Sequence, residues 1–166
     1  MSNDDGVRGK QWLEQFLQIT GLSSKVTVDI SKLETEGSCW LVIDPEALSP
    51  HQIESLIGNQ GTGLDAIQYL ANTILNVGCE RGEQQAYTIE LNGYRVQRQA
   101  ELRDLAESAA TNVRETGEEF EIKDLSSAER RQIHTLFQDW EDLETESRGK
   151  EPDRRLVVRQ KAEAMS

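Results

Sequence analysis

The C-terminal part of the chain contains basic residues whose types and spacing are suited to holding phosphate groups. Arg130 and His134 lie four positions apart, which places them on one face of a predicted helix. The basic residues that follow them are Arg148, Lys150, Arg154 and Arg155. The planar guanidinium group of arginine can donate two hydrogen bonds to one phosphate. We therefore predict that these six side chains converge on one phosphate-binding patch.

The same residues also have simpler interpretations. An arginine and a histidine on a helix are often only part of a solvated surface, and charged residues protect an edge strand from pairing with another chain. Arg154 and Arg155 occupy successive positions, so in a strand one of them faces away from the patch. The density of basic residues near Arg130 and His134 favours the phosphate site.

A second candidate site is the turn Gly58-Asn59-Gln60-Gly61, which is followed by the neutral hydrogen-bond donor Thr62. A tight turn between two helices leaves the first backbone N–H groups of the second helix pointing at the turn, where the helix dipole favours an anion. Glycines allow a nucleic-acid backbone to approach closely because they lack a Cβ atom. Alternatively, the turn serves only as a connector between the helices.

Hydrophobic periodicity predicts the elements that must position these two sites. The predicted helices span about 11–21, 49–58, 62–78, 94–117 and 126–140. The predicted strands span about 25–30, 38–44, 87–91, 119–122, 145–147 and 156–159. This order indicates an α/β (α+β) protein of two small units, at 10–93 and 94–160, with the long helix that starts at Tyr94 as the bridge.

Net charge restricts how the chain can meet a nucleic acid. The 166 residues include 18 basic and 30 acidic side chains, which give a net charge of −12. Sequence-independent binding to nucleic acid depends on Lys and Arg, so the chain taken as a whole repels a polyanion. Residues 1–123 carry 10 basic and 20 acidic side chains, whereas residues 124–166 carry 8 and 10. We therefore expect any nucleic-acid site in the C-terminal third.

Several classes of protein are disfavoured by composition. Cys39 and Cys79 lie far apart without a Cys or His cluster, which argues against a disulfide scaffold and a zinc site and fits a reducing compartment. No apolar run approaches the roughly 18 residues of a membrane span, and the acidic start shows no signal peptide. The sequence predicts a cytoplasmic protein without membrane insertion, metal or cofactor.

The sequence gives little support to an enzyme. His51 and His134 are its two histidines, and no nucleophile is evident beside His51. The chain lacks a phosphate-binding Walker loop, and its carboxylates are too numerous for one catalytic pair to stand out. We therefore predict a non-enzymatic protein.

Two motif blocks together resemble the bacterial Jag family, also called KhpB. The first is Leu56–Gly61 with the helix that follows it, and the second is Glu129–His134 with the segment Ser147–Arg155. In that family a KH domain precedes an R-three-H domain, which is named after an Arg-x-x-x-His signature, here Arg130 and His134. Both motifs stand in the family's order, and the likeness extends over roughly residues 10–160.

The resemblance implies both a fold and a function. It implies a KH domain with a three-stranded sheet and helices at 10–93, and an R-three-H domain with a small sheet packed on helices at 94–160. It further implies a cytoplasmic, non-enzymatic protein that binds single-stranded RNA or single-stranded DNA and acts as a post-transcriptional regulator. In KH domains the glycine turn holds the nucleic-acid backbone. Some family members pair with a second small KH protein, so such a partner or self-association is expected.

One departure from the family favours an alternative function. Asn59 and Gln60 stand where the family often has basic residues, and they offer hydrogen bonds without charge attraction. Together with the acidic first two thirds of the chain, they favour a KH unit that has lost RNA binding. Such a unit would serve as an adaptor for another protein or as a dimerisation module.

Overall fold

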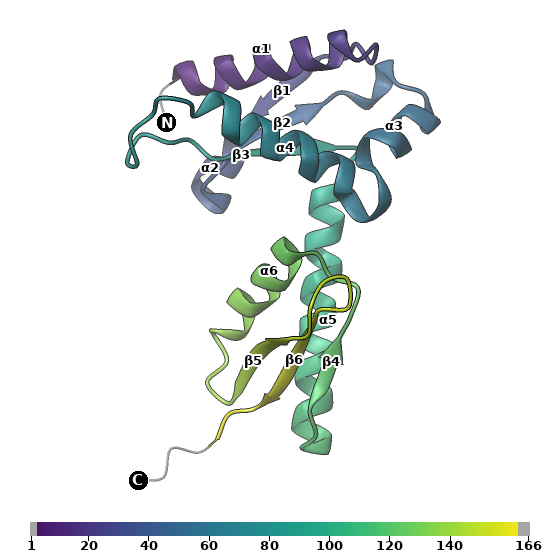
Figure 1. Cartoon of the computed structure of the whole chain (residues 1–166), viewed down its shortest axis with the longest axis vertical. Coiled ribbons are helices and arrows are strands. Elements are labelled where there is room, and N and C mark those ends of the chain that lie inside the picture. The colour runs from purple at the N-terminus through teal and green to yellow at the C-terminus, as the bar shows by residue number, and fades with distance from the viewer. Residues whose placement is uncertain (1–2, 163–166) are drawn as a thin grey trace. The chain divides into compact units, whose positions relative to one another are not determined.

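The structure is a computed structural model that describes residues 3–162 of the chain. These residues form two compact units, which divide between Arg95 and Val96 (Figure 1). Each unit contains one three-stranded sheet together with helices. This arrangement confirms the predicted α/β fold class with two small units.

The first unit follows the order helix, strand, helix, strand, helix, helix, strand. Its elements are α1 (Asn3–Ile19), β1 (Val26–Asp29), α2 (Ser31–Glu36), β2 (Cys39–Ile43), α3 (Pro50–Ile57), α4 (Thr62–Leu75) and β3 (Tyr87–Leu91). In its sheet β2 is central, antiparallel to β1 and parallel to β3. The register pairs Leu41 with Val28 on one side and with Ile89 on the other.

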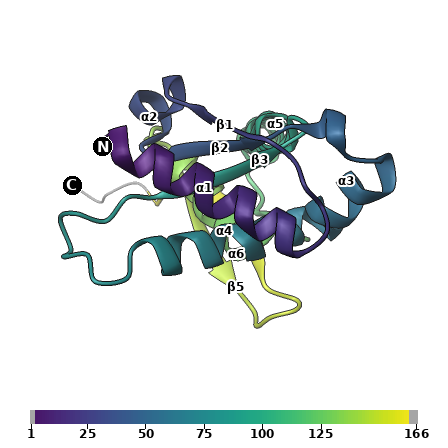
Figure 2. The same ribbon diagram turned by 90° about the horizontal axis from the view of Figure 1, so that it is seen from above.

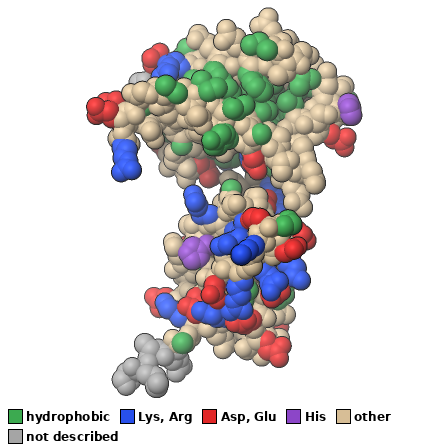
Figure 3. All heavy atoms as spheres, in the orientation of Figure 1, with side chains coloured by type: hydrophobic (Ala, Val, Ile, Leu, Met, Phe, Trp, Pro, Cys, Tyr) green, Lys and Arg blue, Asp and Glu red, His purple; other side chains and the backbone are tan. Residues whose placement is uncertain are grey.

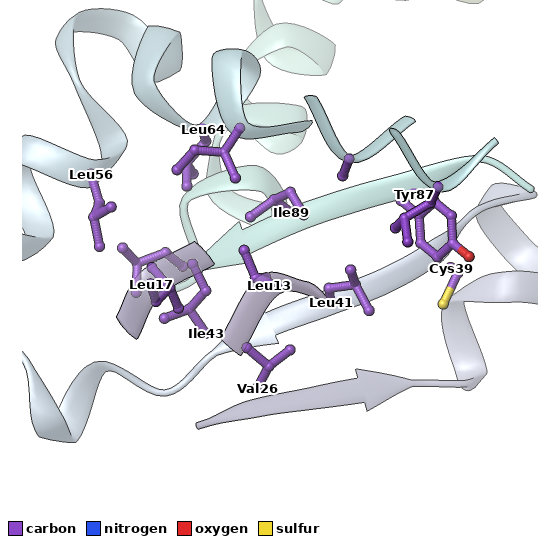
Figure 4. Close-up of a cluster of buried hydrophobic side chains, with 14 of the residues drawn as sticks. Leu13, Leu17, Val26, Cys39, Leu41, Ile43, Leu56, Leu64, Tyr87 and Ile89 are labelled. Atoms are coloured by element: carbon purple, nitrogen blue, oxygen red, sulfur yellow. The ribbon is translucent and has the colours of Figure 1, made fainter. Parts of the chain in front are cut away.

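Helices cover one face of this sheet and enclose the core of the first unit. In Figures 1 and 2, α1 and α4 run beside the strands, and both helices contribute buried residues to the same cluster. Leu13 of α1, Leu41 of β2 and Ile89 of β3 are fully buried and gather in Figure 4. The same burial raises the pKa of the Cys39 thiol, with Asp5 adding a smaller electrostatic contribution.

The opposite face of this sheet is partly covered by α2, which the sequence did not predict. Trp40 lies on this face and is 2% exposed, with the Lys32 ammonium 4.9 Å from its ring centre. Strand β1 ends at Asp29, and Ile30 is 64% exposed because the chain turns there into α2. The strand therefore ends one residue earlier than the predicted range of 25–30.

A capping box fixes the start of α3. The Ser49 hydroxyl accepts a hydrogen bond from the Gln52 backbone N–H at 3.2 Å, and the Gln52 side chain accepts one from the Ser49 N–H at 2.9 Å. Pro50 occupies the first helical position, where its missing N–H has no cost. The predicted start of this helix is confirmed.

The second unit takes most of α5 and all the elements after it. Its elements are α5 (Tyr94–Thr116, from Val96 onward), β4 (Phe120–Ile122), α6 (Ser127–Phe137), β5 (Leu143–Arg148) and β6 (Arg155–Gln160). The sheet is antiparallel, with β6 between β4 and β5. Its core lies between the two helices and one face of the sheet, and includes Ala106, Ile133, Leu143 and Val158.

Close packing of α3 against α4 depends on one glycine. A Cβ atom added to Gly63 would lie 2.1 Å from the backbone oxygen of Leu56, which cannot move without disturbing α3. By contrast, a Cβ atom at Gly82 would meet no atom of residues 3–162 within 4 Å, its two chain neighbours aside. Gly63 therefore sets the distance between the two helices that flank the Gly58–Gly61 turn.

We predict that Gly63→Ala lowers the free energy of unfolding by about 2 kcal/mol or more, since the overpacking cost exceeds the gain in helix propensity. Gly82→Ala should change it by less than about 0.5 kcal/mol, because it is a surface substitution. Urea denaturation followed by circular dichroism measures both. Equal stability of the two variants would show that α3 and α4 do not pack as closely as described.

Candidate nucleic-acid interface

A pocket of about 560 Å³ lies in the second unit between α6 and the β5–β6 hairpin. It is lined by cationic and hydroxyl side chains, both of which donate hydrogen bonds to phosphate oxygens. The lining residues are Ser127, Arg130, Arg131, His134, Thr145, Ser147, Glu151, Arg154 and Leu156. The pocket brings together three of the six predicted phosphate ligands, Arg130, His134 and Arg154.

Helix α6 presents its pocket residues by helical spacing. Ser127, Arg131 and His134 follow one another at intervals of four and three, while Ile133 and Phe137 are buried on the inner face. The helix begins at a capping box in which the Ser126 hydroxyl accepts from the Glu129 N–H, and the Glu129 carboxylate accepts from the Ser126 N–H. These bonds fix the start of α6 beside the pocket.

Arg98 of α5 anchors this cap. Its guanidinium donates to both carboxylate oxygens of Glu129, from Nε at 2.7 Å and from Nη2 at 3.3 Å. Glu129 is 7% exposed, so its negative charge is stabilised by this arginine and by the Ser126 N–H group. The first turn of α6 is therefore held to α5 by a network of charged groups.

Arg130 occupies the floor of the pocket rather than its surface. Its side chain is 6% exposed, and Nη1 donates to the backbone oxygen of Leu125 at 2.7 Å. Nη2 donates to the carboxylate of Glu151, which is 59% exposed, and lies 3.5 Å from the Ser127 hydroxyl. In this structure the charge of Arg130 is thus neutralised by a carboxylate from the β5–β6 turn.

The other nitrogen-bearing side chains of the pocket, on His134, Arg131 and Arg154, are more accessible. His134 is exposed, and a hydrogen bond between its Nδ1 and the Thr145 hydroxyl orients the ring. Arg131 and Arg154 are also exposed, and neither forms an ion pair with a carboxylate of residues 3–162. Arg154 Nη1 donates to the backbone oxygen of Gly149 at 3.3 Å. These three groups can meet an incoming anion directly.

Arg148 lies on the other face of the sheet, where carboxylates surround it. Its two terminal nitrogens donate to Glu119 at 2.8 and 3.0 Å, and Nε donates to Glu146 at 3.0 Å. These bonds raise the pKa of the Arg148 guanidinium, Glu119 contributing most, and the Arg148 side chain lowers the pKa of the Glu119 carboxyl. Figure 3 shows positive and negative side chains interspersed over this unit.

Further ion pairs follow along the same face of the β5–β6 hairpin. We call it the ladder face; it carries Glu144, Glu146, Arg148, Arg155, Val157 and Arg159. Arg159 donates from Nε to Glu144 at 2.7 Å and from Nη1 to Glu146 at 3.3 Å. Between these long side chains Val157 is fully buried, although it lies on the face turned away from the core of the second unit. The arginines on this face therefore stabilise the sheet and cover Val157.

The prediction that six basic side chains form one patch is wrong for Arg148 and Arg155 and unsupported for Lys150, whereas the expectation that Arg154 and Arg155 face opposite ways is confirmed. Arg148 and Arg155 have side chains on the ladder face, and Arg155 Nε is 3.2 Å from Glu121. Arg155 also lines a neighbouring hollow of about 330 Å³, with Lys123 and Arg154 among its other residues. Lys150 is exposed in the β5–β6 turn and lines neither hollow. Because successive strand residues face opposite sides of the sheet, Arg148 and Arg155 lie away from the pocket that Arg154 lines.

The Gly58–Gly61 turn forms as predicted between α3 and α4. Gln60 adopts a left-handed conformation (φ 55°), and α4 begins without a side-chain cap on its first N–H groups. Gly61 packs against Tyr94, whose ring would lie 2.6 Å from an added Cβ atom. Asn59, Gln60 and Thr62 are exposed. The structure brings the five predicted residues together in one turn.

Sequence reasoning missed Arg131 and Glu151 as pocket residues. Arg131 lies three positions before His134, so helical spacing would have placed it beside that histidine. Glu151 lies in a turn, and no periodicity of the sequence signals its contact with Arg130. Within residues 3–162, no group of three or more His, Cys, Asp or Glu side chains is arranged to hold a metal ion. No described helix is both long and apolar enough to cross a membrane.

Comparison with known proteins identifies the chain's relatives. A sequence model of the R-three-H domain matches residues 100–160, which include α6 and the β5–β6 hairpin. The RNA-binding protein KhpB of Bacillus subtilis is 30% identical over 156 residues, which cover 93% of this chain and 70% of that protein. The chain belongs to the KhpB family. The predicted resemblance to the Jag (KhpB) family is confirmed, and the pocket lies in the R-three-H domain.

Other relatives in the KhpB family differ more in length from this chain. The RNA-binding protein KhpB of Clostridium symbiosum is 27% identical over 92% of this chain and 65% of its own length. The protein of the same name from Lactiplantibacillus plantarum is 34% identical over 62% of this chain and 31% of its own length. The chain thus spans just under two thirds of the first of these relatives and about a third of the second.

The ion-pair ladder predicts a specific dependence of stability on pH. Because the pKa of Glu119 is lowered in the folded state, its contribution is present above the unfolded value of about 4.3 and is lost as the pH falls through the folded value. Glu119→Gln should therefore lower the unfolding temperature slightly at pH 7, and this effect should diminish as the pH falls below about 4. Thermal unfolding followed by circular dichroism measures the difference.

The matched control is Glu118→Gln, which removes the same charge from an exposed side chain that forms no ion pair within residues 3–162. The unfolding temperature of this variant should stay close to that of the wild-type protein over the same pH range. A Glu119→Gln effect that persists unchanged in acid would show that the pair with Arg148 does not stabilise the fold.

Proposed function

We propose that this chain binds single-stranded RNA without catalysing a reaction, and that the pocket beside α6 holds its phosphates. The observation that supports this most is the gathering of Arg131, His134 and Arg154, none of which pairs with a carboxylate of residues 3–162. Arg130, at the floor of the pocket, pairs with Glu151. The relatives of the KhpB family carry the name RNA-binding protein. In bacteria, such a protein would act in the cytoplasm as a post-transcriptional regulator.

Electrostatics supports the pocket as the place where the RNA backbone docks. The chain carries a net charge of −12, so RNA is repelled at long range and must be attracted locally. Most arginines of the hairpin are already neutralised by glutamates on the ladder face. Uncompensated positive charge therefore concentrates at the pocket, where hydroxyl groups of Ser127, Thr145 and Ser147 add further hydrogen-bond donors.

For the first unit we propose a KH domain at about residues 10–93, with the R-three-H domain at about 94–160. Its order of elements and the turn between α3 and α4 support this assignment. The exposed Asn59, Gln60 and Thr62 side chains and the uncapped first turn of α4 offer hydrogen bonds to an RNA backbone. In this proposal the turn guides the RNA and the pocket beside α6 supplies the charge.

Two arginines of the hairpin provide a direct test. We predict that Arg154→Ala weakens binding of single-stranded RNA about tenfold, because a charged hydrogen bond to phosphate is lost. The slope of log affinity against log salt should fall by about 0.7 for each lost phosphate contact. Fluorescence anisotropy with a labelled single-stranded RNA pool over a range of salt concentrations measures both quantities.

Arg148→Ala is the matched control, because it removes the same charge from the same hairpin but from the ladder face. It should leave the salt slope unchanged while lowering thermal stability. Equal effects of the two substitutions on RNA affinity would count against the pocket and in favour of diffuse attraction.

A second candidate function is that of an adaptor, in which the first unit binds another protein, such as a second small KH protein or another copy of this chain. The uncharged turn supports it, as does an apolar stripe on α4 that includes Leu70 and Ile74, which are 39% and 48% exposed. Co-purification with and without nuclease treatment separates the two functions. A partner that stays bound after the RNA is destroyed supports the adaptor, and one that is released supports RNA binding.

A further inference from the structure

The carboxylate of Glu151 occupies a place in the pocket that an anionic ligand needs. It is the acidic group among the residues that line the pocket, and it pairs with Arg130 on the pocket floor. For a phosphate to contact the guanidinium of Arg130, this carboxylate must first withdraw. The inference that follows rests on the proposed binding of RNA in this pocket.

The two partners of this pair differ in freedom of movement. The Arg130 side chain is 6% exposed and is held by the backbone oxygen of Leu125 at 2.7 Å. The Glu151 side chain is 59% exposed and belongs to the turn between β5 and β6, where Arg130 is its ion-pair partner within residues 3–162. When the pair opens, Glu151 can rotate into solvent, whereas Arg130 must remain in the pocket.

The buried guanidinium of Arg130 requires a counter-charge both in the free protein and in the protein bound to RNA. Removing the only anionic partner of a largely buried cation is costly, because the cation has lost its water and gains nothing in return. In the free protein Glu151 supplies that counter-charge. In the bound protein a phosphate oxygen can supply it, so the exchange conserves the charge balance around Arg130.

We propose that Glu151 is a resident competitor that determines which anions the pocket accepts. An incoming anion must replace the Glu151 carboxylate at Arg130 and gain further contacts to bind. Phosphate has oxygens directed to several sides, so it can contact Arg130 together with Arg131, His134 or Arg154. A single carboxylate from an acidic protein gains little over Glu151, so the pocket favours nucleic acid.

Substitutions at Glu151 test this competition. We predict that Glu151→Gln binds labelled single-stranded RNA about fivefold or more tightly than the wild-type protein, because the charged competitor for Arg130 is removed. Glu151→Asp keeps the net charge but withdraws the carboxylate by one methylene group, so its affinity should lie between the two. Fluorescence anisotropy at one salt concentration measures all three proteins.

Glu118→Gln controls for the change in net charge, since it neutralises an exposed carboxylate that does not line the pocket. It should change the RNA affinity by less than about twofold. The unfolding temperature of each variant is measured without RNA to confirm that it folds. Glu151→Gln should have a clearly lower unfolding temperature than the wild-type protein when free, because Arg130 loses its counter-charge, and it should gain more stability when RNA is added.

The outcomes separate this inference from the function on which it rests. If the wild-type protein binds RNA and Arg154→Ala weakens binding, but Glu151→Gln and Glu118→Gln bind alike, Glu151 is not a competitor and the proposed function stands. If Glu151→Gln binds more weakly than the wild-type protein while remaining folded, Glu151 helps to build the site and the inference is overturned. If none of the proteins binds RNA, both proposals fail.

Discussion

The alternation of side chains along the β5–β6 hairpin decides which charges of the second unit can reach a ligand. Thr145 and Ser147 face α6 and line the pocket, whereas their neighbours Glu144, Glu146 and Arg148 project from the other face of the sheet. A shift of one residue in this register would exchange the two sets. The hydrophobic residues Leu143 and Val158, which are buried against the helices, hold the register in place.

Charged side chains have different roles on the two faces of the β5–β6 sheet. On the ladder face, arginines and glutamates are paired at distances of 2.7 to 3.3 Å, so their charges largely cancel. In the pocket, the one carboxylate faces several cationic groups, and positive charge remains. A strongly acidic chain can in this way keep a local site for a polyanion, because screening in salt limits repulsion from its more distant carboxylates.

Much of the fold followed from local patterns of the sequence. The predicted helix starts near residues 49 and 126 and the glycine turn at Gly58 are confirmed by the structure, in which Ser49 and Ser126 cap the two helices. Helix α2 was missed because its six residues are too short to show periodicity, and none of them is buried. Its position depends on contacts with β2, which no local pattern of the sequence records.

Only part of the candidate site could be predicted in the same way. The spacing of Arg130 and His134 correctly placed both beside one pocket, because residues four apart share a helix face. The sequence could not show that Arg130 is largely buried, or that Arg148 pairs with Glu119, since these contacts join residues from distant parts of the chain. Basic residues that are adjacent in sequence were therefore assigned to one patch although the sheet separates them.

The most direct measurement is nuclear magnetic resonance of the two histidine rings during titration with single-stranded RNA. His134 lines the pocket, and His51 lies in the first turn of α3 in the other unit, so it serves as an internal reference. If the pocket holds RNA phosphates, the ring signals of His134 shift and saturate with the RNA concentration, and they shift more than those of His51. His134 signals that remain unchanged at saturating RNA would contradict the assignment of the pocket.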